Sequence, residues 1–356
     1  MDRTRRRRVG GAAALGAVLF WAGGAPALAA LIEGTPGDDS LTGTAAADTM
    51  FGEGGDDSLS GSDGNDVLHG GPGADTLSGG LGQDALRGDS GPDVLRGDSG
   101  PDRLFTVGND EALGGPDSDR VSVGRGAPAA RGQGGTDWLF TEGAGSATLY
   151  GGPGSDLLQV LGDGVGKALD GGPDDDQLEA RSDGATLRGG DGADGLVTRW
   201  TGTLDGGPGD DTLVSDATPA TRTVVRCGDG VDRVSGDKAD VIAADCETVE
   251  IQVVGDDTDE VITGTTFDDS IAANGGDDEV HGLAGDDGID AGLGLDTVDA
   301  GPGDDTVFSF HGSRFEIPGD VDAVACGDGE DTAFVDDVDT VAADCETVFS
   351  AVAPQG

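Results

Sequence analysis

Residues 34–105 read GTPGDDSLT, GTAAADTMF, GEGGDDSLS, GSDGNDVLH, GGPGADTLS, GGLGQDALR, GDSGPDVLR and GDSGPDRLF, eight nonapeptides in unbroken register. Gly opens every copy, Asp stands in the sixth place and a large apolar residue stands in the eighth. Glycine permits tight turns and close approach of neighbouring backbones. A fixed period with a fixed carboxylate predicts a repeat architecture in which each copy is one structural unit.

The nine places divide into a turn and a short strand. Places one to six are rich in Gly and predict a turn that exposes carbonyl oxygens, and places seven to nine predict a three-residue strand. Because side chains alternate along a strand, place eight faces one side and places seven and nine face the other. Strands stacked about 4.8 Å apart bury the eighth-place residues and bring successive turns within reach of one shared ion.

The composition limits what kind of protein this is. The chain has 356 residues with 69 Gly and 4% aromatic residues, which argues against large cores of bulky side chains. Its formal charge of -50 favours self-repulsion, and low hydrophobicity with high charge is also typical of disordered chains, which is the alternative interpretation. Carboxylates favour hard cations such as calcium. Nucleic acid is a poor partner, because phosphate contacts need clustered Lys and Arg.

The sixth-place acids continue beyond the first tract. Residues 255–308 form six more copies, of which the first carries Glu260 and lacks the fourth-place Gly, so its site is doubtful. In between, the clear copies are spaced 17 to 20 residues apart, so one coil there spans two turns and only one turn keeps the signature. The candidate metal ligands are Asp39, Asp48, Asp57, Asp66, Asp75, Asp84, Asp93, Asp102, Asp119, Asp137, Asp156, Asp176, Asp194, Asp211, Asp269, Asp278, Asp287, Asp296 and Asp305.

These residues resemble a known family, the hemolysin-type or RTX repeat proteins, whose nonapeptide is GGxGxDxUx with U a large apolar residue. Residues 70–78, GGPGADTLS, match it in every defined place. The resemblance implies an all-β fold, a right-handed parallel β-roll or β-helix solenoid. It also implies multiple calcium ions, held by the sixth-place acids and turn carbonyls. Unlike the toxins and proteases of that family, this chain has an N-terminal signal, and its repeats fill the molecule.

Four cysteines lie in two copies of one module, which begin at Cys227 and Cys326. Cys246 and Cys345 follow 19 residues later, close to the length of one coil. The partners are therefore expected on adjacent rungs, near the Cα separation that a disulfide requires. An even count in an exported protein supports two bridges, and a zinc site or free thiols are the alternatives.

The first residues differ in kind from the rest. Arg3 and residues 5–8 are basic, residues 9–24 are apolar, and residues 27–29 read Ala-Leu-Ala, which predicts a signal peptide cut after Ala29. The alternative is a membrane anchor, although the stretch is shorter than the roughly 20 residues of a spanning helix. The prediction is a secreted or envelope-associated protein without a membrane span after cleavage, and the sequence leaves Sec and Tat export open.

Catalytic motifs are explained by the repeat. The two GDSGP sequences at residues 88–92 and 97–101 look like a serine protease motif, but both lie in repeat register. His69 and His281 occupy outward ninth places and His311 lies in a degenerate segment, and none has a spaced partner. No GxSxG, HExxH or phosphate-binding loop is present. We therefore expect no enzyme.

The expected function is calcium binding coupled to folding, with a structural or adhesive extracellular role. The alternatives are an RTX-type secreted enzyme or toxin with an unrecognised catalytic site, and a binder of ice or crystal faces, which the mixed outward residues disfavour. The expected segments are a signal peptide (1–29), tandem repeats (30–113), 18-residue coils (114–214), a first cysteine module (215–250), a second repeat tract (251–308), a second cysteine module (309–349) and a tail (350–356).

Overall fold

A computed structural model describes residues 28–126, 129–141, 145–162, 167–215, 222–309 and 321–351. Across these ranges the chain forms strands and turns and no helix, so nothing in them meets the requirements of a membrane-spanning helix. All the strand pairs are parallel, and the predicted all-β solenoid of parallel rungs is confirmed. The predicted signal peptide, apart from its last two residues, lies outside the described residues, and so does His311.

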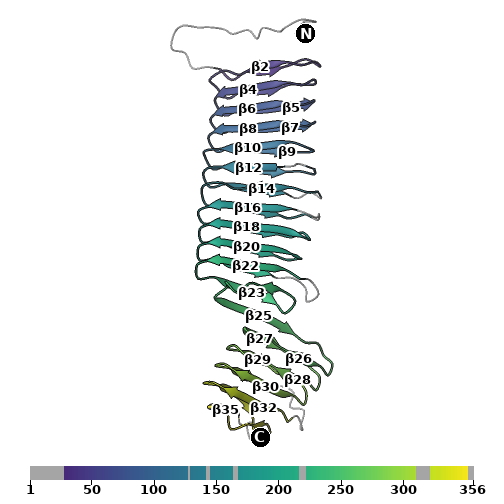
Figure 1. Cartoon of the computed structure of the whole chain (residues 1–356). Coiled ribbons are helices and arrows are strands. Elements are labelled where there is room, and N and C mark those ends of the chain that lie inside the picture. Colours follow the sequence, from purple (N-terminus) through teal and green to yellow (C-terminus); the bar gives the residue numbers. More distant parts are fainter. Residues whose placement is uncertain are drawn as a thin grey trace. The chain divides into compact units, whose positions relative to one another are not determined.

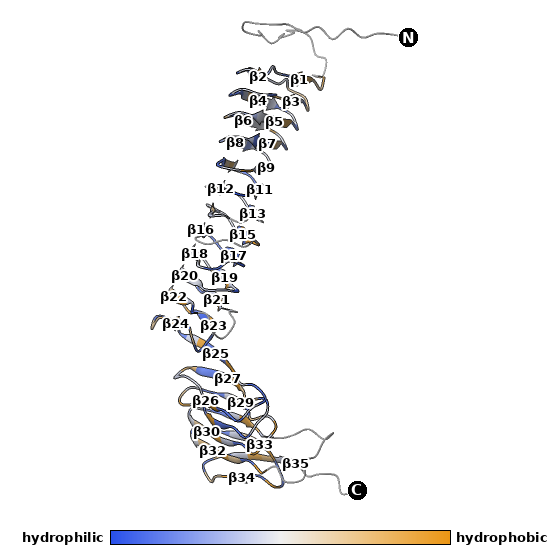
Figure 2. Cartoon of the chain, turned by 90° about the vertical axis from the view of Figure 1, so that its right-hand side faces the viewer, coloured by the Kyte–Doolittle hydropathy of each residue, from blue (hydrophilic) through white to orange (hydrophobic). Residues whose placement is uncertain are grey.

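The chain divides into two compact units, residues 1–183 with 188–191, and residues 184–187 with 192–356. In the first unit the odd-numbered strands form one row and the even-numbered strands another (Figures 1 and 2). Its strands are β1 (Leu31–Glu33), β2 (Ser40–Thr42), β3 (Thr49–Phe51), β4 (Ser58–Asp63), β5 (Val67–Pro72), β6 (Thr76–Leu81), β7 (Ala85–Ser90), β8 (Val94–Ser99), β9 (Arg103–Thr106), β10 (Glu111–Gly115), β11 (Arg120–Val123), β12 (Ala129–Gln133), β13 (Trp138–Thr141), β14 (Thr148–Tyr150), β15 (Leu157–Val160), β16 (Ala168–Pro173) and β17 (Gln177–Ala180).

The unit boundary divides β18 (Ala185–Asp191). In the second unit the odd-numbered strands again form one row, while the even-numbered strands β20 to β24 belong to a 12-stranded sheet and β26 to β34 form a separate 5-stranded sheet. Its strands are β19 (Gly195–Thr198), β20 (Gly202–Pro208), β21 (Thr212–Ser215), β22 (Val224–Asp229), β23 (Arg233–Asp237), β24 (Val241–Ile242), β25 (Thr248–Val254), β26 (Val261–Thr263), β27 (Asp268–Ala272), β28 (Glu279–His281), β29 (Gly288–Asp290), β30 (Thr297–Pro302), β31 (Thr306–Phe308), β32 (Ala323–Asp328), β33 (Thr332–Asp336), β34 (Thr340–Val341) and β35 (Thr347–Ala351).

The eighth-place residues form the core, as the sequence predicts. Leu59 of β4 pairs with Leu77 of β6, and Leu68 of β5 pairs with Leu86 of β7, so one full coil spans 18 residues. These four side chains are fully buried or nearly so. The core is therefore a narrow double column of aliphatic side chains, consistent with the scarcity of aromatic residues.

Two expectations about the strands differ in outcome. The three-residue strand is correct for β1 to β3, but β4 to β8 are six residues long and run into the next copy. They lengthen because places two and three pair with the same places of the neighbouring rung, as in Gly80 with Asp98. The doubled period of the middle region is confirmed, because β14 and β16 fill the second row where the turn signature is lost.

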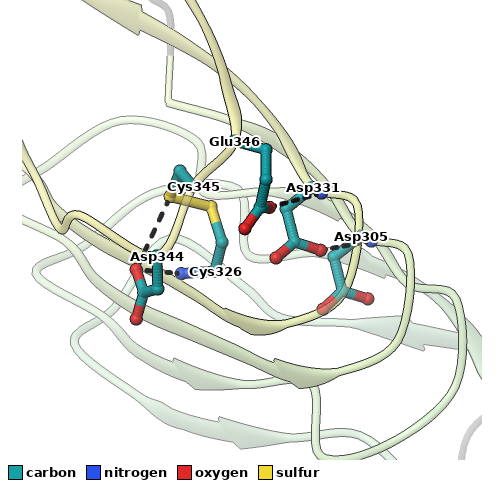
Figure 3. The surroundings of a disulfide bond; sticks show 6 residues. All are labelled: Asp305, Cys326, Asp331, Asp344, Cys345 and Glu346. Carbon is teal, nitrogen blue, oxygen red and sulfur yellow. Dashed lines mark hydrogen bonds between the residues drawn. A yellow bond between two sulfur atoms is a disulfide. The ribbon is translucent and has the colours of Figure 1, made fainter.

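The two predicted disulfides are confirmed. Cys227 is bonded to Cys246 and Cys326 to Cys345, with Cα separations of 5.2 and 5.1 Å. The zinc and free-thiol alternatives are wrong, since all four cysteines are bridged. The first bridge joins β22 to the segment between β24 and β25, and the second joins β32 to the segment between β34 and β35 (Figure 3 shows the second).

Glycine at the fourth place is required by the neighbouring rung. Gly82 has a φ of 134°, and a Cβ there would overlap the carbonyl oxygen of Gly64. We expect Gly82→Ala to lower the free energy of unfolding by about 2 kcal/mol or more, because strain and overlap act together. Denaturant unfolding in saturating calcium measures the loss. Gly37→Ala is the matched control, because a Cβ there has open space; equal losses in both variants would contradict the interpretation.

Candidate metal centres

The sixth-place acids form columns in which each carboxylate links two rungs. The backbone N–H of Asp57 donates to Oδ1 of Asp75 at 2.8 Å, and the N–H of Asp75 donates in turn to Oδ1 of Asp93 at 2.8 Å. The same bond runs from Asp66 to Asp84 at 2.7 Å in the other row. One oxygen of each carboxylate therefore stabilises the stacking, and the second oxygen remains to be accounted for.

The second oxygen, Oδ2, is buried and accepts no hydrogen bond from the described residues in most copies. A Cβ on the opening Gly70 would overlap Oδ2 of Asp75, so this oxygen lies against the glycine that begins its own turn. A buried acceptor without a donor is costly, and a buried carboxylate without a counter-charge more so. The copies with this arrangement have Asp57, Asp66, Asp75, Asp84, Asp93, Asp102, Asp119, Asp137, Asp156, Asp211, Asp278, Asp287 and Asp305 in sixth place, and the cysteine modules add Asp232 and Asp331.

We call a turn open when Oδ2 of its sixth-place carboxylate has no donor, and closed when a backbone N–H of the turn donates to that carboxylate. The backbone conformation at the second place differs between the two kinds. In every open copy the second-place residue has positive φ, including non-glycine residues such as Glu53 at 77° and Leu283 at 87°. In the copies that begin Gly-Thr, the Thr does not have positive φ. There the N–H groups of Thr35, Thr44 and Thr265 donate to Oδ2 of Asp39, Asp48 and Asp269. The doubtful first copy of the second tract is closed in the same way, because the N–H of Asp256 donates to Oε2 of Glu260.

The open turns fit a hard cation. Among the described residues no three His, Cys, Asp or Glu side chains converge on one point, so any ion would need backbone carbonyl oxygens beside the single carboxylate. Calcium accepts such mixed carboxylate and carbonyl sets. The buried Oδ2 of each open turn supplies the negative charge, and the glycine-rich backbone leaves room for close approach.

A comparison with protein families agrees with this geometry. The model for the RTX calcium-binding nonapeptide repeat matches residues 33–68, 51–86, 60–95, 87–106, 203–217, 254–289 and 289–309. The chain contains RTX calcium-binding nonapeptide repeats. Such repeats bind calcium ions, several in each repeat region. No curated protein matches the chain.

The RTX ladder extends beyond the residues that the family model matches. Asp119, Asp137 and Asp156 continue one column with N–H to Oδ1 distances of 2.7 Å. In each cysteine module one column ends on a glutamate, because the N–H groups of Asp232 and Asp331 donate to Glu247 and Glu346 at 2.9 Å (Figure 3 shows the second pair).

Sequence reasoning missed two members of the columns. Asp110 is fully buried and accepts the N–H of Asp93 at 3.1 Å, and Asp322 accepts the N–H of Asp296 at 2.9 Å. Asp110 follows Asp102 after eight residues and not nine, so its copy is one residue short and has no opening Gly, while in the copy of Asp322 the opening place holds Ile317. The fourth-place Gly108, two residues before Asp110, is the signal that finds the first.

The GDSGP motifs are ordinary RTX turns. Asp89 and Asp98 are second-place residues with φ of 70° and 71°, close to the 77° of Glu53 in a copy without the motif. His69 lies 3.5 Å from Asp89, but its ring stacks on Phe51 and it sits on the outward face of β5. The repeat therefore accounts for these residues.

One lysine occupies a sixth place. Residues 162–170 read GDGVGKALD, and the pairing of β14 with β16 puts Lys167 level with Ala147 in the row where the carboxylates have lapsed. Lys167 is 1% exposed, and its Nζ donates to the carbonyl oxygen of Gly162, the opening residue of its copy, at 2.9 Å. A cation of the chain itself thus binds a carbonyl of this turn.

Burial raises the pKa of several sixth-place carboxyls of the open turns in the metal-free chain. Desolvation is the largest cause at Asp84, Asp102, Asp137 and Asp287, and neighbouring carboxylates add to it at each of these positions. The pKa of Asp102 is raised to about 8, those of Asp119, Asp137 and Asp287 to about 7, and that of Asp84 to about 6. Backbone N–H donors oppose the shift without cancelling it.

Acid should therefore partly replace calcium. The folded-state pKa values of about 6 to 8 exceed the ordinary value of 3.8, so proton uptake stabilises the metal-free fold fully below about pH 4, and this contribution is lost as pH rises through 6 to 8. In metal-depleted buffer we expect β-type circular dichroism to increase from pH 8 to pH 5. A calcium-loaded sample, expected to stay constant, is the control. A metal-free chain that is equally disordered at both pH values, or more ordered at pH 8, would contradict this.

Lys167 should stabilise its rung independently of calcium. Lys167→Met leaves the Gly162 carbonyl without its donor, so we expect the free energy of unfolding to fall by about 1–3 kcal/mol. The loss should be the same at two calcium concentrations that both saturate folding. Lys238→Met, at an exposed position, is the control and should change little. A loss that shrinks with added calcium would show that Lys167 acts through a metal site.

Proposed function

We propose that this protein is an exported calcium-dependent scaffold whose RTX turns fold as they bind calcium. The observation that carries the proposal is the row of buried Oδ2 atoms without donors, in a chain with a formal charge of -50. Without cations these carboxylates are desolvated beside one another, which opposes folding. Calcium binds the folded turns and not the extended chain, so its binding free energy contributes to folding.

The open turns are the proposed calcium sites. In these copies the sixth-place carboxylate, with Oδ2 turned toward its own opening glycine, would hold the ion together with turn carbonyls. Asp176, Asp194 and Asp296 belong to the same columns and are assigned the same role. Asp39, Asp48 and Asp269 have Oδ2 already bonded to a Thr N–H, so we propose that they bind calcium more weakly.

The proposed place of work is outside the cell. Two disulfides favour an oxidising compartment, and the basic and apolar sequence before Ala30 favours export. Calcium-binding modules that act outside cells have sites of low affinity, with dissociation constants of about 0.1 to 1 mM. A structural or adhesive role fits repeats that fill the chain, and the proposal includes no catalytic activity. The proposal also includes the division of the chain into the seven segments that the sequence predicts, from the signal peptide to the tail.

A calcium titration followed by far-ultraviolet circular dichroism tests the proposal. The metal-depleted chain at neutral pH should give a disordered spectrum, and calcium should convert it cooperatively to a β spectrum, whereas magnesium should not. Asp75→Asn keeps an acceptor for the N–H of Asp57 but removes the charge, so its midpoint should rise at least about twofold.

Asp56→Asn is the matched control. Its exposed carboxylate accepts the N–H of Ala74 at 2.8 Å from the neighbouring turn, and its midpoint should stay close to that of the unmodified chain. A β spectrum at neutral pH without metal, unchanged by calcium, would refute the proposal. Equal shifts in both variants would refute the site assignment alone.

A further inference from the structure

One outward face of the first unit holds a single acidic residue, Asp89 of β7, in a chain that has 70 acidic residues. It is the outer face of the odd-numbered strands from β3 to β13, which pair in sequence as neighbouring rungs. Its seventh and ninth places hold Thr49, Phe51, Val67, His69, Ala85, Arg87, Arg103, Phe105, Arg120, Ser122, Trp138 and Phe140. Basic and aromatic residues therefore share a face of an acidic protein, and we call this set the arginine–aromatic face.

Two arginines stand directly opposite each other on this face. Arg103 of β9 pairs in register with Arg120 of β11, and both side chains are exposed. Like charges at paired positions destabilise a sheet. Neither arginine makes an ion pair with any residue in the described part of the chain, although Arg87 pairs with Asp89 of its own strand at 2.6 Å. The Arg103–Arg120 pair is thus a repulsive feature that an external anion would relieve.

The aromatic side chains are arranged beside these charges. The Arg120 guanidinium lies 4.0 Å from the ring centre of Trp138 and 5.0 Å from that of Phe140, so cation–π contacts hold it beside both rings. Phe105 is 44% exposed and follows Arg87 in the ninth-place column. At the other end the rings of Phe51 and His69 are stacked. Arginine side chains and aromatic rings are therefore neighbours along the direction in which the rungs stack.

We propose that the arginine–aromatic face binds an acidic polysaccharide, laid along the rungs. Sugar rings present flat apolar faces to aromatic side chains, and their carboxylates are bidentate partners for guanidinium groups. The segments that lead into β5 and β11 carry Asp63 and Asp117, so acidic side chains lie along the edge of the face where these strands begin. A flat anionic membrane would meet this acidic edge and be repelled.

Charge density separates this partner from nucleic acid. A polyphosphate concentrates negative charge and depends on many basic contacts, which a chain of net charge -50 with three arginines on the face does not supply. A polysaccharide with widely spaced carboxylates requires fewer. Among the residues that the structure describes, the opposite face of the same unit has no such pair of facing arginines without ion pairs. Arg131 on that face is paired with Glu111 at 3.3 Å and lies over Tyr150.

The test measures binding by calorimetry to hyaluronan and polygalacturonate oligosaccharides, with dextran as the uncharged control. The full chain is used in saturating calcium, after circular dichroism has confirmed its fold, so failure of the calcium proposal is seen separately. At least one acidic oligosaccharide should bind and dextran should not. The double variant Arg103→Ala/Arg120→Ala should weaken binding at least about tenfold, and Phe105→Ala about threefold.

The matched control is Arg96→Ala/Arg131→Ala, which removes the same charge from the opposite face and should change affinity less than about twofold. If the first double variant fails to fold, Arg103→Gln/Arg120→Gln replaces it. The proposal is overturned if neither acidic oligosaccharide binds, or if the two double variants lose affinity equally. Tighter binding of oligo(dT) or of anionic vesicles in the same assay would likewise overturn it and assign the face to that partner.

Discussion

The whole structure depends on a carboxylate that is used twice. Oδ1 of Asp75 accepts the N–H of Asp57 from the rung before it, which fixes the stacking, while Oδ2 stays buried against the turn without a donor. The first bond requires a side-chain oxygen acceptor at that place, and the second oxygen of the carboxylate makes the same side chain costly to bury. Rung stacking and cation dependence are therefore linked in one residue.

Much of this could be read from the sequence, because the repeat fixes the geometry that matters. The eighth-place core, the sixth-place columns, the two-turn coils and both disulfides follow from spacing alone, since a period of nine in a parallel stack leaves one register. Asp110 and Asp322 escaped because their opening Gly is lost, although their sixth-place role is intact. A search that requires the opening Gly misses copies that keep only the sixth-place Asp and the residues after it.

The distinction between open and closed turns could not be read from the acids. It depends on whether the second-place residue adopts positive φ, and Glu53 and Leu283 do so although neither is Gly. The neighbouring rungs impose that backbone, so it is a tertiary effect that overrides residue preference. Threonine is found at the second place in three of the closed copies, where its N–H reaches the carboxylate instead.

Lys167 shows how an RTX turn can lose its sixth-place carboxylate and still hold its rung in place. A buried sixth-place Asp needs an external positive charge, whereas Lys167 brings its own and directs it to the carbonyl of Gly162. The charge therefore stays with the chain and cannot be removed by a chelator. Where a lysine or a Thr N–H takes the place of an open turn, the stacking is held by the protein itself. Under the proposed function, the open turns are the part of the fold in which calcium would control whether the rungs stay together.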